Sequence, residues 1–251
     1  MIITPVEKIN NVFFKREDKF SCFSVQGAKA RAALYLIRKA KKLGFIGVTT
    51  AGSRMSPQIE IVSFIAKELG LKFTAHCPSG ELSQELLNAK KNGANIIQHK
   101  AGYNSVIIAR SKQYAIDNNY FEIPFGMDCI ESVNQTKLQV VNIPKNIKRI
   151  IIPIGSGINV CGLLLGLIEN NTHIPVIGIQ VGADPVKTLN KYVNNWEKYL
   201  TILKSNVDYH TKIKNNVYKK IELDPIYEAK CIEFVKPYDL FWIIGKRKSV
   251  L

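Results

Sequence analysis

Cysteine is scarce in this sequence of 251 residues and shows no pattern that predicts a disulfide or a metal site. The cysteines include no C-x-x-C pair and lie far apart, at Cys22, Cys77, Cys129, Cys161 and Cys231. An odd number of scattered cysteines argues against a disulfide scaffold and is typical of reduced, mostly buried thiols. The four histidines also lack metal-ligand spacing, so we expect no metal.

Long hydrophobic runs are missing as well. No apolar stretch reaches the ~18–20 residues that a membrane-spanning helix needs. The opening residues, MIITPVEKIN, contain no basic segment followed by an apolar block, so no signal peptide is expected. The sequence therefore predicts a cytoplasmic protein with no membrane partner.

Acidic side chains are few, with 20 Asp and Glu against 35 Lys and Arg, for a formal net charge of +15. A strong positive field attracts polyanions, so nucleic acid or an anionic substrate is one interpretation. The lysines are spread along the chain and not gathered into one tract. We favour the other interpretation, that abundant lysine, asparagine and isoleucine reflect an AT-rich genome.

Segments typical of strands and of helices alternate along the chain. Expected strands are 44–50, 71–77, 94–98, 149–154, 174–181 and 240–245. Expected helices are 56–69, 83–93, about 104–117, 159–168 and 186–205. This alternation predicts parallel sheets with helices on both faces. The segment 140–148 has the character of a linker between two α/β units.

The strongest local motif is a buried strand that runs into Gly155-Ser156-Gly157 and then into a helix. Glycines let the backbone turn tightly and approach a ligand closely. The start of a helix presents free N–H groups and the positive end of the helix dipole to a phosphate. The alternative is a strand–helix turn that only needs glycine.

A second motif places Gly27-Ala28-Lys29 just before a helix that begins near Ala30. A lysine amine forms a Schiff base with an aldehyde cofactor when its pKa is lowered or a partner assists it. The alternative is an exposed lysine without a chemical role.

Four segments, in this order, resemble the fold-type II pyridoxal-5′-phosphate (PLP) enzymes of the tryptophan synthase β-like superfamily. Lys-Arg-Glu-Asp at 15–18, followed by Gly-x-Lys-x-Arg at 27–31, is similar to the family's cofactor-lysine region. AGSRMSPQ at 51–58 falls where one branch has its substrate-carboxylate loop, and 155–163 resembles the phosphate loop. LDPIYEAK at 223–230 resembles that branch, the 1-aminocyclopropane-1-carboxylate (ACC) deaminase and D-cysteine desulfhydrase group.

The resemblance implies a fold of two open, twisted, mostly parallel sheets flanked by helices. It implies a larger PLP-anchoring domain formed by 1–35 and 140–251, a smaller α/β domain formed by 36–139, and the cofactor in the cleft between them. It also implies a homodimer.

The resemblance implies roles for individual residues. Lys29 would carry the cofactor as a Schiff base and would move the α-proton. The phosphate would be bound by the glycine loop and the start of its helix, at Gly155, Ser156, Gly157, Ile158 and Asn159.

The remaining implied roles concern the substrate and the cofactor ring. Ser53 and Ser56 would lie at the substrate carboxylate, and Tyr227 near the reacting carbon. Glu228 would face the pyridine nitrogen, where a carboxylate favours the pyridinium form and strengthens the ring as an electron sink. On spacing alone, Tyr227 and Glu228 would instead begin a helix after Pro225, with Glu228 facing solvent.

Three residues depart from the family pattern. Arg54 stands where an asparagine commonly contacts the ring hydroxyl, and Ile158 and Asn159 replace a common Gly-Thr. Asn159 can still donate from its amide, and Ile158 can still offer its backbone N–H. Arg54 in a pocket would select a substrate with an acidic group beyond the α-carboxylate. On a basic outer surface it would matter little.

The resulting prediction is a PLP-dependent lyase or deaminase that acts on a small amino acid or amino-acid-like group. The alternatives are a β-replacement synthase of the cysteine or threonine synthase type, against which Arg54 and Glu228 count, and a PLP enzyme acting on a nucleic-acid-linked or other polyanionic substrate. A nucleic-acid enzyme or binding module and a PLP-binding protein without turnover are further alternatives.

Overall fold

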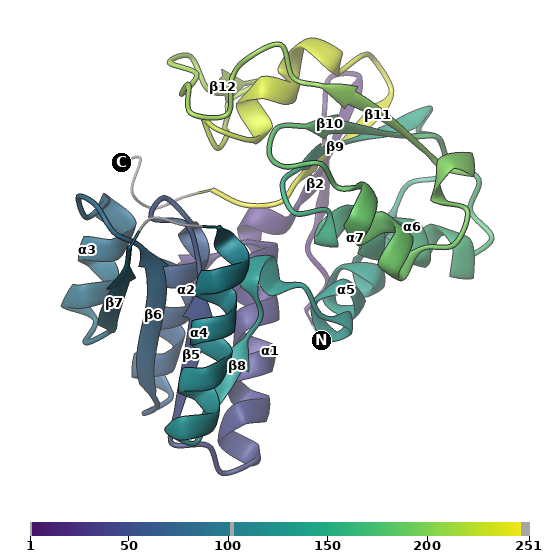
Figure 1. Cartoon of the computed structure of the whole chain (residues 1–251). Helices are drawn as coiled ribbons and strands as arrows, with labels where there is room; N and C mark the ends of the chain where they lie inside the picture. Colours follow the sequence, from purple (N-terminus) through teal and green to yellow (C-terminus); the bar gives the residue numbers. More distant parts are fainter. Residues whose placement is uncertain (1, 101–102, 247–251) are drawn as a thin grey trace. The chain divides into compact units, whose positions relative to one another are not determined.

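The computed structural model describes residues 2–100 and 103–246 and divides into two compact units (Figure 1). Unit 1 comprises the chain up to Phe20, Gln26–Ala28 and Ser132–Lys246, and unit 2 comprises Ser21–Val25 and Lys29–Glu131. Residues 1, 101, 102 and 247–251, which the sequence-based domains include, lie outside the described residues.

Unit 1 is built on a six-stranded sheet in the order β1-β2-β14-β9-β10-β11. The strands are β1 (Val6–Ile9), β2 (Val12–Arg16), β14 (Asp239–Ile243), β9 (Arg149–Ile154), β10 (Val176–Gln180) and β11 (Leu200–Lys204). β1 runs antiparallel to β2, and the other neighbouring pairs are parallel. The carboxyl ends of five strands therefore meet at one edge of the sheet, where α/β proteins bind ligands.

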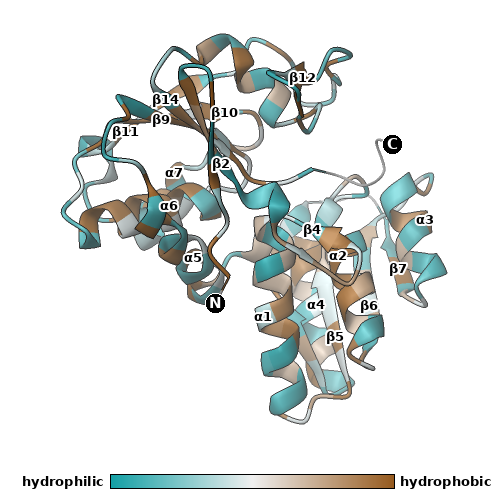
Figure 2. Ribbon diagram, turned by 180° about the vertical axis from the view of Figure 1, so that it is seen from behind, coloured by the Kyte–Doolittle hydropathy of each residue, from teal (hydrophilic) through white to brown (hydrophobic). Residues whose placement is uncertain are grey.

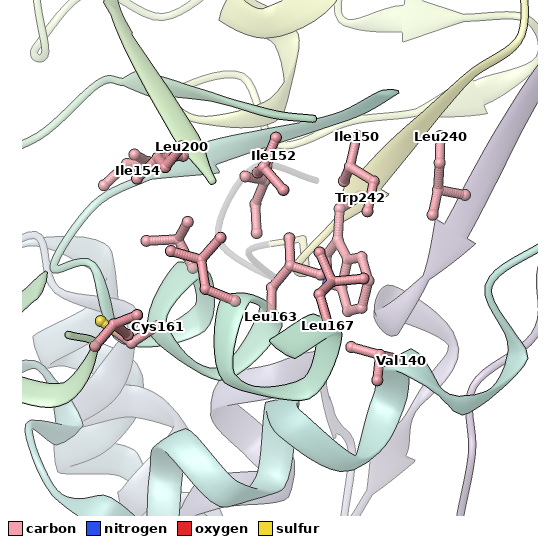
Figure 3. Close-up of a cluster of buried hydrophobic side chains, with 14 of the residues drawn as sticks. Val140, Ile150, Ile152, Ile154, Cys161, Leu163, Leu167, Leu200, Leu240 and Trp242 are labelled. Atoms are coloured by element: carbon pink, nitrogen blue, oxygen red, sulfur yellow. The ribbon is translucent and has the colours of Figure 1, made fainter. Parts of the chain in front are cut away.

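The central strands of this sheet are buried on both faces because their side chains alternate between two hydrophobic clusters. On one face Ile150 and Ile152 of β9 and Trp242 of β14 pack with Leu163 and Leu167 of α6 (Ile158–Glu169), as Figure 3 shows. On the other face the core includes Ile151, Phe14, Phe241, Leu223 and Cys231. Figure 2 shows the hydrophobic colouring along β9, β10 and β14. Each such side chain stabilises the fold by about 1.5–3 kcal/mol.

The other elements of unit 1 are short. They are η1 (Glu17–Lys19), η3 (Leu138–Asn142), α7 (Val186–Tyr192), η4 (Trp196–Lys198), β12 (Val217–Tyr218), β13 (Ile221–Glu222) and η5 (Glu228–Phe234). Helix α5 (Ile130–Lys137) belongs mainly to unit 1. The small strands β3 (Ser21–Cys22) and β4 (Val25–Gln26) pair with each other.

Unit 2 is built on a four-stranded parallel sheet in the order β7-β6-β5-β8. Its strands are β5 (Gly47–Ala51), β6 (Lys72–Pro78), β7 (Asn95–His99) and β8 (Tyr120–Ile123). Its helices are α1 (Ala28–Lys42), α2 (Pro57–Glu68), α3 (Gln84–Lys91) and α4 (Asn104–Asp117), and η2 (Phe125–Met127) follows β8. Side-chain caps at Ser56 and Ser83 begin α2 and α3. From Lys29 onward α1 packs within unit 2, whereas the sequence-based division kept residues up to 35 in the larger domain.

The structure confirms the predicted fold class, parallel sheets flanked by helices, and most of the predicted elements. The long helix predicted for 186–205 is wrong. Helix α7 ends at Tyr192, Asn195 adopts a left-handed φ of 52°, and Leu200–Lys204 form β11 beside β10. Pairing with a distant strand prevails here over helical spacing.

The linker predicted for 140–148 is also wrong. Residues 138–142 form η3, and Val140 and Ile147 are buried in the core of unit 1. No helix in the described part of the chain combines the length and the apolar character that a membrane crossing requires.

Candidate cofactor site

The predicted phosphate loop lies at the carboxyl edge of the unit 1 sheet, between β9 and α6. Gly157 is the N-cap of α6 and has a φ of +89°, a conformation that L side chains rarely adopt. No side chain among the described residues caps this helix. The first N–H groups of α6 are therefore available to an anion, with the positive end of the helix dipole behind them.

Gly155 packs closely against an aromatic ring. A Cβ added at Gly155 would lie 3.1 Å from Cε1 of Tyr227. A Cβ added at Gly182, just after β10, would lie 3.2 Å from Cα of Gly155. The chain ends just past β9 and β10 thus approach each other at two glycines, where a side chain would be crowded.

The two departures in the phosphate loop have structural roles. Ile158 buries its side chain in the core under the sheet, so only its backbone remains for a ligand. The side-chain oxygen of Asn159 accepts a hydrogen bond of 3.0 Å from Thr136 Oγ1. This bond orients the Asn159 amide, whose NH₂ group is then the donor that remains. Ser156 is exposed.

Glu228 is buried and does not face solvent, which excludes the interpretation drawn from spacing alone. Its Oε1 accepts hydrogen bonds from the backbone N–H groups of Ile244 (2.9 Å) and Gly245 (3.2 Å), just past β14. Burial raises the pKa of the Glu228 carboxyl well above its ordinary value, and the charge of Asp224 raises that pKa further.

Tyr227 lies at the start of η5 and is partly buried. Its hydroxyl oxygen lies 3.2 Å from that of Tyr209, and the two rings meet edge to face. The buried Asp224 accepts bonds from the backbone N–H groups of Ile226 and Tyr227, which fixes the turn before η5. Sequence reasoning missed the roles of Tyr209 and Gly182. It also missed the turn at Asp224, for which the Asp-Pro pair was a recognisable signal.

The cofactor lysine predicted at position 29 is in the first turn of α1 and is partly exposed. The preceding residues belong to unit 1. The N–H of Ala28 donates to the carbonyl of Ile244 at 2.9 Å. Gly27 has a φ of +93°, and a Cβ there would lie 2.8 Å from the Ile244 oxygen, so only glycine fits.

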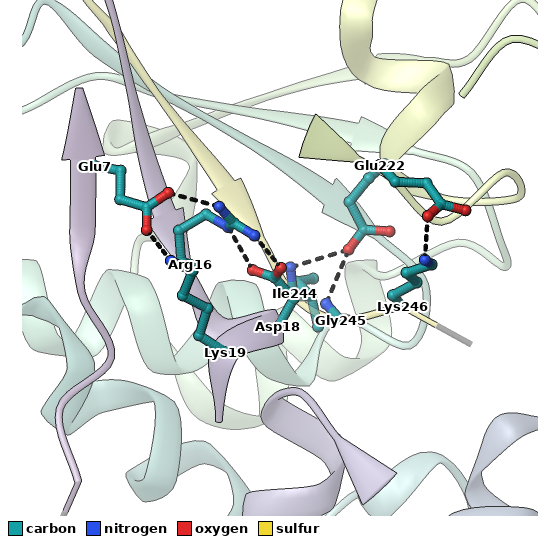
Figure 4. Close-up of polar contacts among 9 residues, drawn as sticks. Glu7, Arg16, Asp18, Lys19, Glu222, Ile244, Gly245 and Lys246 are labelled. Carbon is teal, nitrogen blue, oxygen red and sulfur yellow. Dashed lines mark hydrogen bonds and ion pairs between the residues drawn. The ribbon is translucent and has the colours of Figure 1, made fainter. Parts of the chain in front are cut away.

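The Lys-Arg-Glu-Asp segment stabilises the same edge of unit 1. Lys15 is fully buried and donates to the Thr4 carbonyl and to Asn142 Oδ1, each at 2.7 Å. Arg16 forms a two-point ion pair with Asp18 and a further pair with Glu7 (Figure 4). Because Arg16 pairs with Ile243 in the sheet, this cluster lies directly beside the end of β14.

The predicted substrate loop lies at the carboxyl edge of the unit 2 sheet, between β5 and α2. Ser53 accepts a backbone bond of 3.0 Å from Ser56, whose side chain caps α2 by accepting from Gln58 N–H at 3.3 Å. Arg54 donates from Nη1 to the Glu81 carbonyl at 2.9 Å, so it ties this loop to the one that follows β6.

Gln58, in the first turn of α2, stabilises the chain next to this loop and was missed by the sequence analysis. It is buried, and its Nε2 donates to Thr50 Oγ1 and to the Pro124 carbonyl, each at 2.8 Å. The loop therefore combines a helix N-terminus with serine side chains, a chemistry suited to a carboxylate.

The residues of unit 1 fit PLP. A helix start without a side-chain cap, at a loop with Gly155 and Gly157, suits a phosphate; the ring of Tyr227 borders Gly155, and a buried carboxylate lies in the same unit. The structure brings Gly155 and Tyr227 together, connects Glu228 to Ala28 through Ile244, and groups Ser53, Arg54 and Ser56 in unit 2.

Comparison with known proteins gives consistent results. The family model "Pyridoxal-phosphate dependent enzyme" matches residues 2–210. An O-seryl-dTMP PLP-dependent decarboxylase of Salmonella phage ViI is 28% identical over 215 residues, which are 70% of this chain and 50% of that protein. An L-threonine ammonia-lyase of Geobacter sulfurreducens is 25% identical over 174 residues, which are 66% of this chain and 42% of that protein. The chain thus spans about half the length of these curated relatives.

Solved structures support the fold. An ACC deaminase homologue superposes with a TM-score of 0.83 at 21% identity, over 99% of this chain and 90% of that one. Threonine deaminase isoform 2 of Solanum lycopersicum gives a TM-score of 0.69 at 12% identity, over 98% and 80%. These neighbours have the fold-type II architecture, and the family match implies PLP as the cofactor. The chain belongs to the family of pyridoxal-phosphate dependent enzymes.

Proposed function

We propose that this protein is a PLP-dependent lyase or deaminase that acts at the α-carbon of an amino acid or amino-acid-like group, with the cofactor attached to Lys29. The observation that carries the proposal is the carboxyl edge of unit 1, where an uncapped helix start, the ring of Tyr227 and the buried Glu228 belong to one unit. Two relatives with lyase names, an ammonia-lyase and a decarboxylase, support the reaction class.

The bound cofactor would supply an electron sink for negative charge at the α-carbon. In the proposal the residues 155–159 bind its phosphate through backbone N–H groups. The Lys29 amine moves the α-proton. The Tyr227 hydroxyl, bonded to Tyr209, supplies or accepts a proton near the reacting carbon. Ser53 and the start of α2 bind the substrate carboxylate.

A screen of amino acids tests this proposal through the products released. We expect ammonia with a 2-oxo acid, or carbon dioxide, from the wild-type protein and neither from Lys29→Ala. Exposed Lys41→Ala, on the same helix, is the matched control and should retain turnover. Products from the Lys29→Ala protein at the wild-type rate would contradict the proposal. Products formed only with an added thiol nucleophile would favour the β-replacement alternative.

A second candidate is an amino acid carried on a nucleotide or another polyanion. The name of the phage relative, O-seryl-dTMP PLP-dependent decarboxylase, and the net charge of +15 favour it. The end of β11 and the segment after it are basic, with exposed lysines at Lys204, Lys212, Lys214 and Lys220. Buried Lys230 anchors this segment by donating to the carbonyls of Asp208 and Tyr209, so the segment also supplies the partner of Tyr227.

Charge-reversal variants test whether the lysines of this segment bind substrate or whether the net charge only reflects amino-acid composition. Lys212→Glu with Lys214→Glu should weaken binding of a seryl-nucleotide and reduce its salt dependence. Lys90→Glu with Lys91→Glu, which changes the net charge equally in unit 2, should have much less effect. Equal losses of seryl-nucleotide binding in both double variants would contradict a specific role of this segment and favour the compositional explanation of the charge.

We also propose a cytoplasmic homodimer. None of the five cysteines, all within the described residues, forms a disulfide, as a reducing compartment favours, and the family resemblance implies the dimer. Light scattering of the purified protein tests the dimer, and a monomer across the micromolar range would contradict it.

A further inference from the structure

The carboxylate of Glu228 connects three segments that are far apart in the sequence. Its Oε1 accepts from Ile244 N–H at 2.9 Å and from Gly245 N–H at 3.2 Å. The carbonyl of Ile244 in turn accepts from Ala28 N–H at 2.9 Å. Ala28 is the first residue of α1 and directly precedes Lys29. We call these four residues, Glu228, Ile244, Gly245 and Ala28, the Glu228 bridge.

We propose that Glu228 is a positioning residue for Lys29, acting through the Glu228 bridge on the backbone from which the cofactor lysine projects. This inference rests on the proposed attachment of PLP to Lys29. It adds a second role to the ring-nitrogen role that the family resemblance implies for the same carboxylate.

The close packing of the bridge supports this role. A Cβ at Gly27 would lie 2.8 Å from the Ile244 oxygen and 2.9 Å from the Gly245 Cα, so the backbone before Lys29 lies directly against the end of β14. Glu228 is only 2% exposed, and a single oxygen accepts both N–H groups. Removing the carboxylate would leave two N–H groups without their acceptor at the point where α1 begins.

The same oxygen can accept in the neutral acid as in the carboxylate. Burial raises the pKa of Glu228 and so favours the neutral acid, and an acceptor of the same shape without charge should preserve the bridge. Glu228→Gln therefore retains the bridge and loses the charge, whereas Glu228→Ala loses both. This pair of variants separates positioning from any effect of the charge on the cofactor ring.

The test measures amide hydrogen exchange of the full-length protein by mass spectrometry or NMR. We expect exchange at Ala28, Ile244 and Gly245 to accelerate by about tenfold or more in Glu228→Ala and to stay within about twofold of wild type in Glu228→Gln, because one lost hydrogen bond changes an opening equilibrium by roughly that factor. Glu197→Ala, which removes an exposed carboxylate of unit 1 away from the bridge, is the matched control and should leave the three amides unchanged.

A second measurement follows the attachment of PLP to Lys29 after removal of the cofactor with hydroxylamine. The visible absorbance should develop about tenfold more slowly in Glu228→Ala than in Glu228→Gln. Gly27→Ala, which keeps Glu228 but forces Gly27 and Ile244 apart, should slow attachment as well.

The outcomes distinguish the two proposals. Failure of the wild-type protein to attach PLP at Lys29 would refute the proposed function, while the exchange data would still report on the bridge. Normal attachment combined with equal exchange and equal attachment rates in wild type, Glu228→Gln and Glu228→Ala would refute the positioning role. Loss of attachment in Glu228→Gln with unchanged exchange would also refute it and leave only the role of the charge at the ring.

Discussion

His76 Nδ1 lies 2.9 Å from His99 Nε2, and the two imidazole rings are stacked within 10° of parallel. Arg110 Nη1 lies 3.0 Å from His99 Nδ1, and because a guanidinium only donates, this nitrogen of His99 accepts. A neutral His99 then donates from Nε2 to His76, which leaves the His76 proton on Nε2. Burial, together with the smaller effect of the neighbouring His99, lowers the pKa of His76 to about 4.

This pair predicts that unit 2 loses stability in mild acid. The ordinary pKa of histidine is about 6.5, so between pH 6.5 and pH 4 the unfolded chain binds a proton at His76 that the folded chain does not. The free energy of unfolding should therefore fall as the pH drops through this window, by up to about 3 kcal/mol, and level off below it. Urea unfolding at pH 7.5, 6.5, 5.5 and 4.5 measures the effect.

Two histidine variants provide the control for this prediction. His76→Phe should remove most of the pH dependence, whereas His210→Phe, at an exposed position of unit 1, should preserve it. A stability that is constant or rises between pH 7.5 and pH 5 would contradict the assignment.

Lys29 should be the site of cofactor attachment. The purified protein should absorb near ~410–430 nm, as a lysine–PLP imine does, and borohydride should fix the label on the peptide that contains Lys29. Lys29→Ala should lose the band and keep its circular dichroism spectrum. Peptide mapping that finds the label on a different lysine would overturn the assignment.

Gly157→Val should weaken PLP binding by more than it lowers stability. A valine at this position would have to adopt a φ of +89°, which L residues rarely do. Its Cβ would lie only 3.3 Å from the Cβ atoms of Pro185 and Thr188. The loop would therefore shift away from the helix start that binds the phosphate in the proposal. Cofactor titration and thermal unfolding measure the two effects. Gly93→Val, at another positive φ with open space around it, is the control for backbone strain alone. An unchanged dissociation constant for PLP would show that the loop is only a strand–helix turn and does not bind the phosphate.

Arg54→Ala tests whether this arginine selects an acidic substrate or only ties two loops together. A pocket role predicts a loss of about 10–100-fold for acidic relative to neutral amino acids, the size of a charge-assisted bidentate bond of roughly 1.5–3 kcal/mol. The observed bond from Arg54 to the Glu81 carbonyl predicts, in addition, a looser segment after β6. Equal losses for all amino acids, with faster proteolysis near Glu81, would leave only the structural role.

The sequence predicted those parts of the fold that depend on local pattern. The apolar run at 149–154 and the helical apolar spacing at 56–69 correctly predicted a strand and a helix. The pattern failed at 186–205, because β11 forms only when it pairs with β10, and no local feature reports that pairing.

In the candidate site, too, local motifs could be predicted from the sequence, whereas contacts between distant segments could not. The glycine loop and the Tyr227-Glu228 pair were recognisable from motifs, but the partners of Glu228 were not, because Ile244 and Ala28 reach it from opposite parts of the chain. A fully buried Lys15 was equally inaccessible to sequence reasoning, since lysine is rarely buried unless paired.

The position of β14 also sets the order in which the two units become complete during translation. β14 lies between β2 and β9, so β2 has only the antiparallel β1 as a neighbour until residues 239–243 have left the ribosome. Unit 2 is almost entirely one continuous stretch, Lys29–Glu131, and is synthesised long before that. The nascent chain therefore contains all of Lys29–Glu131 while β2 still lacks β14 and exposes its apolar side chains. During this interval a chaperone has the most exposed apolar surface to bind.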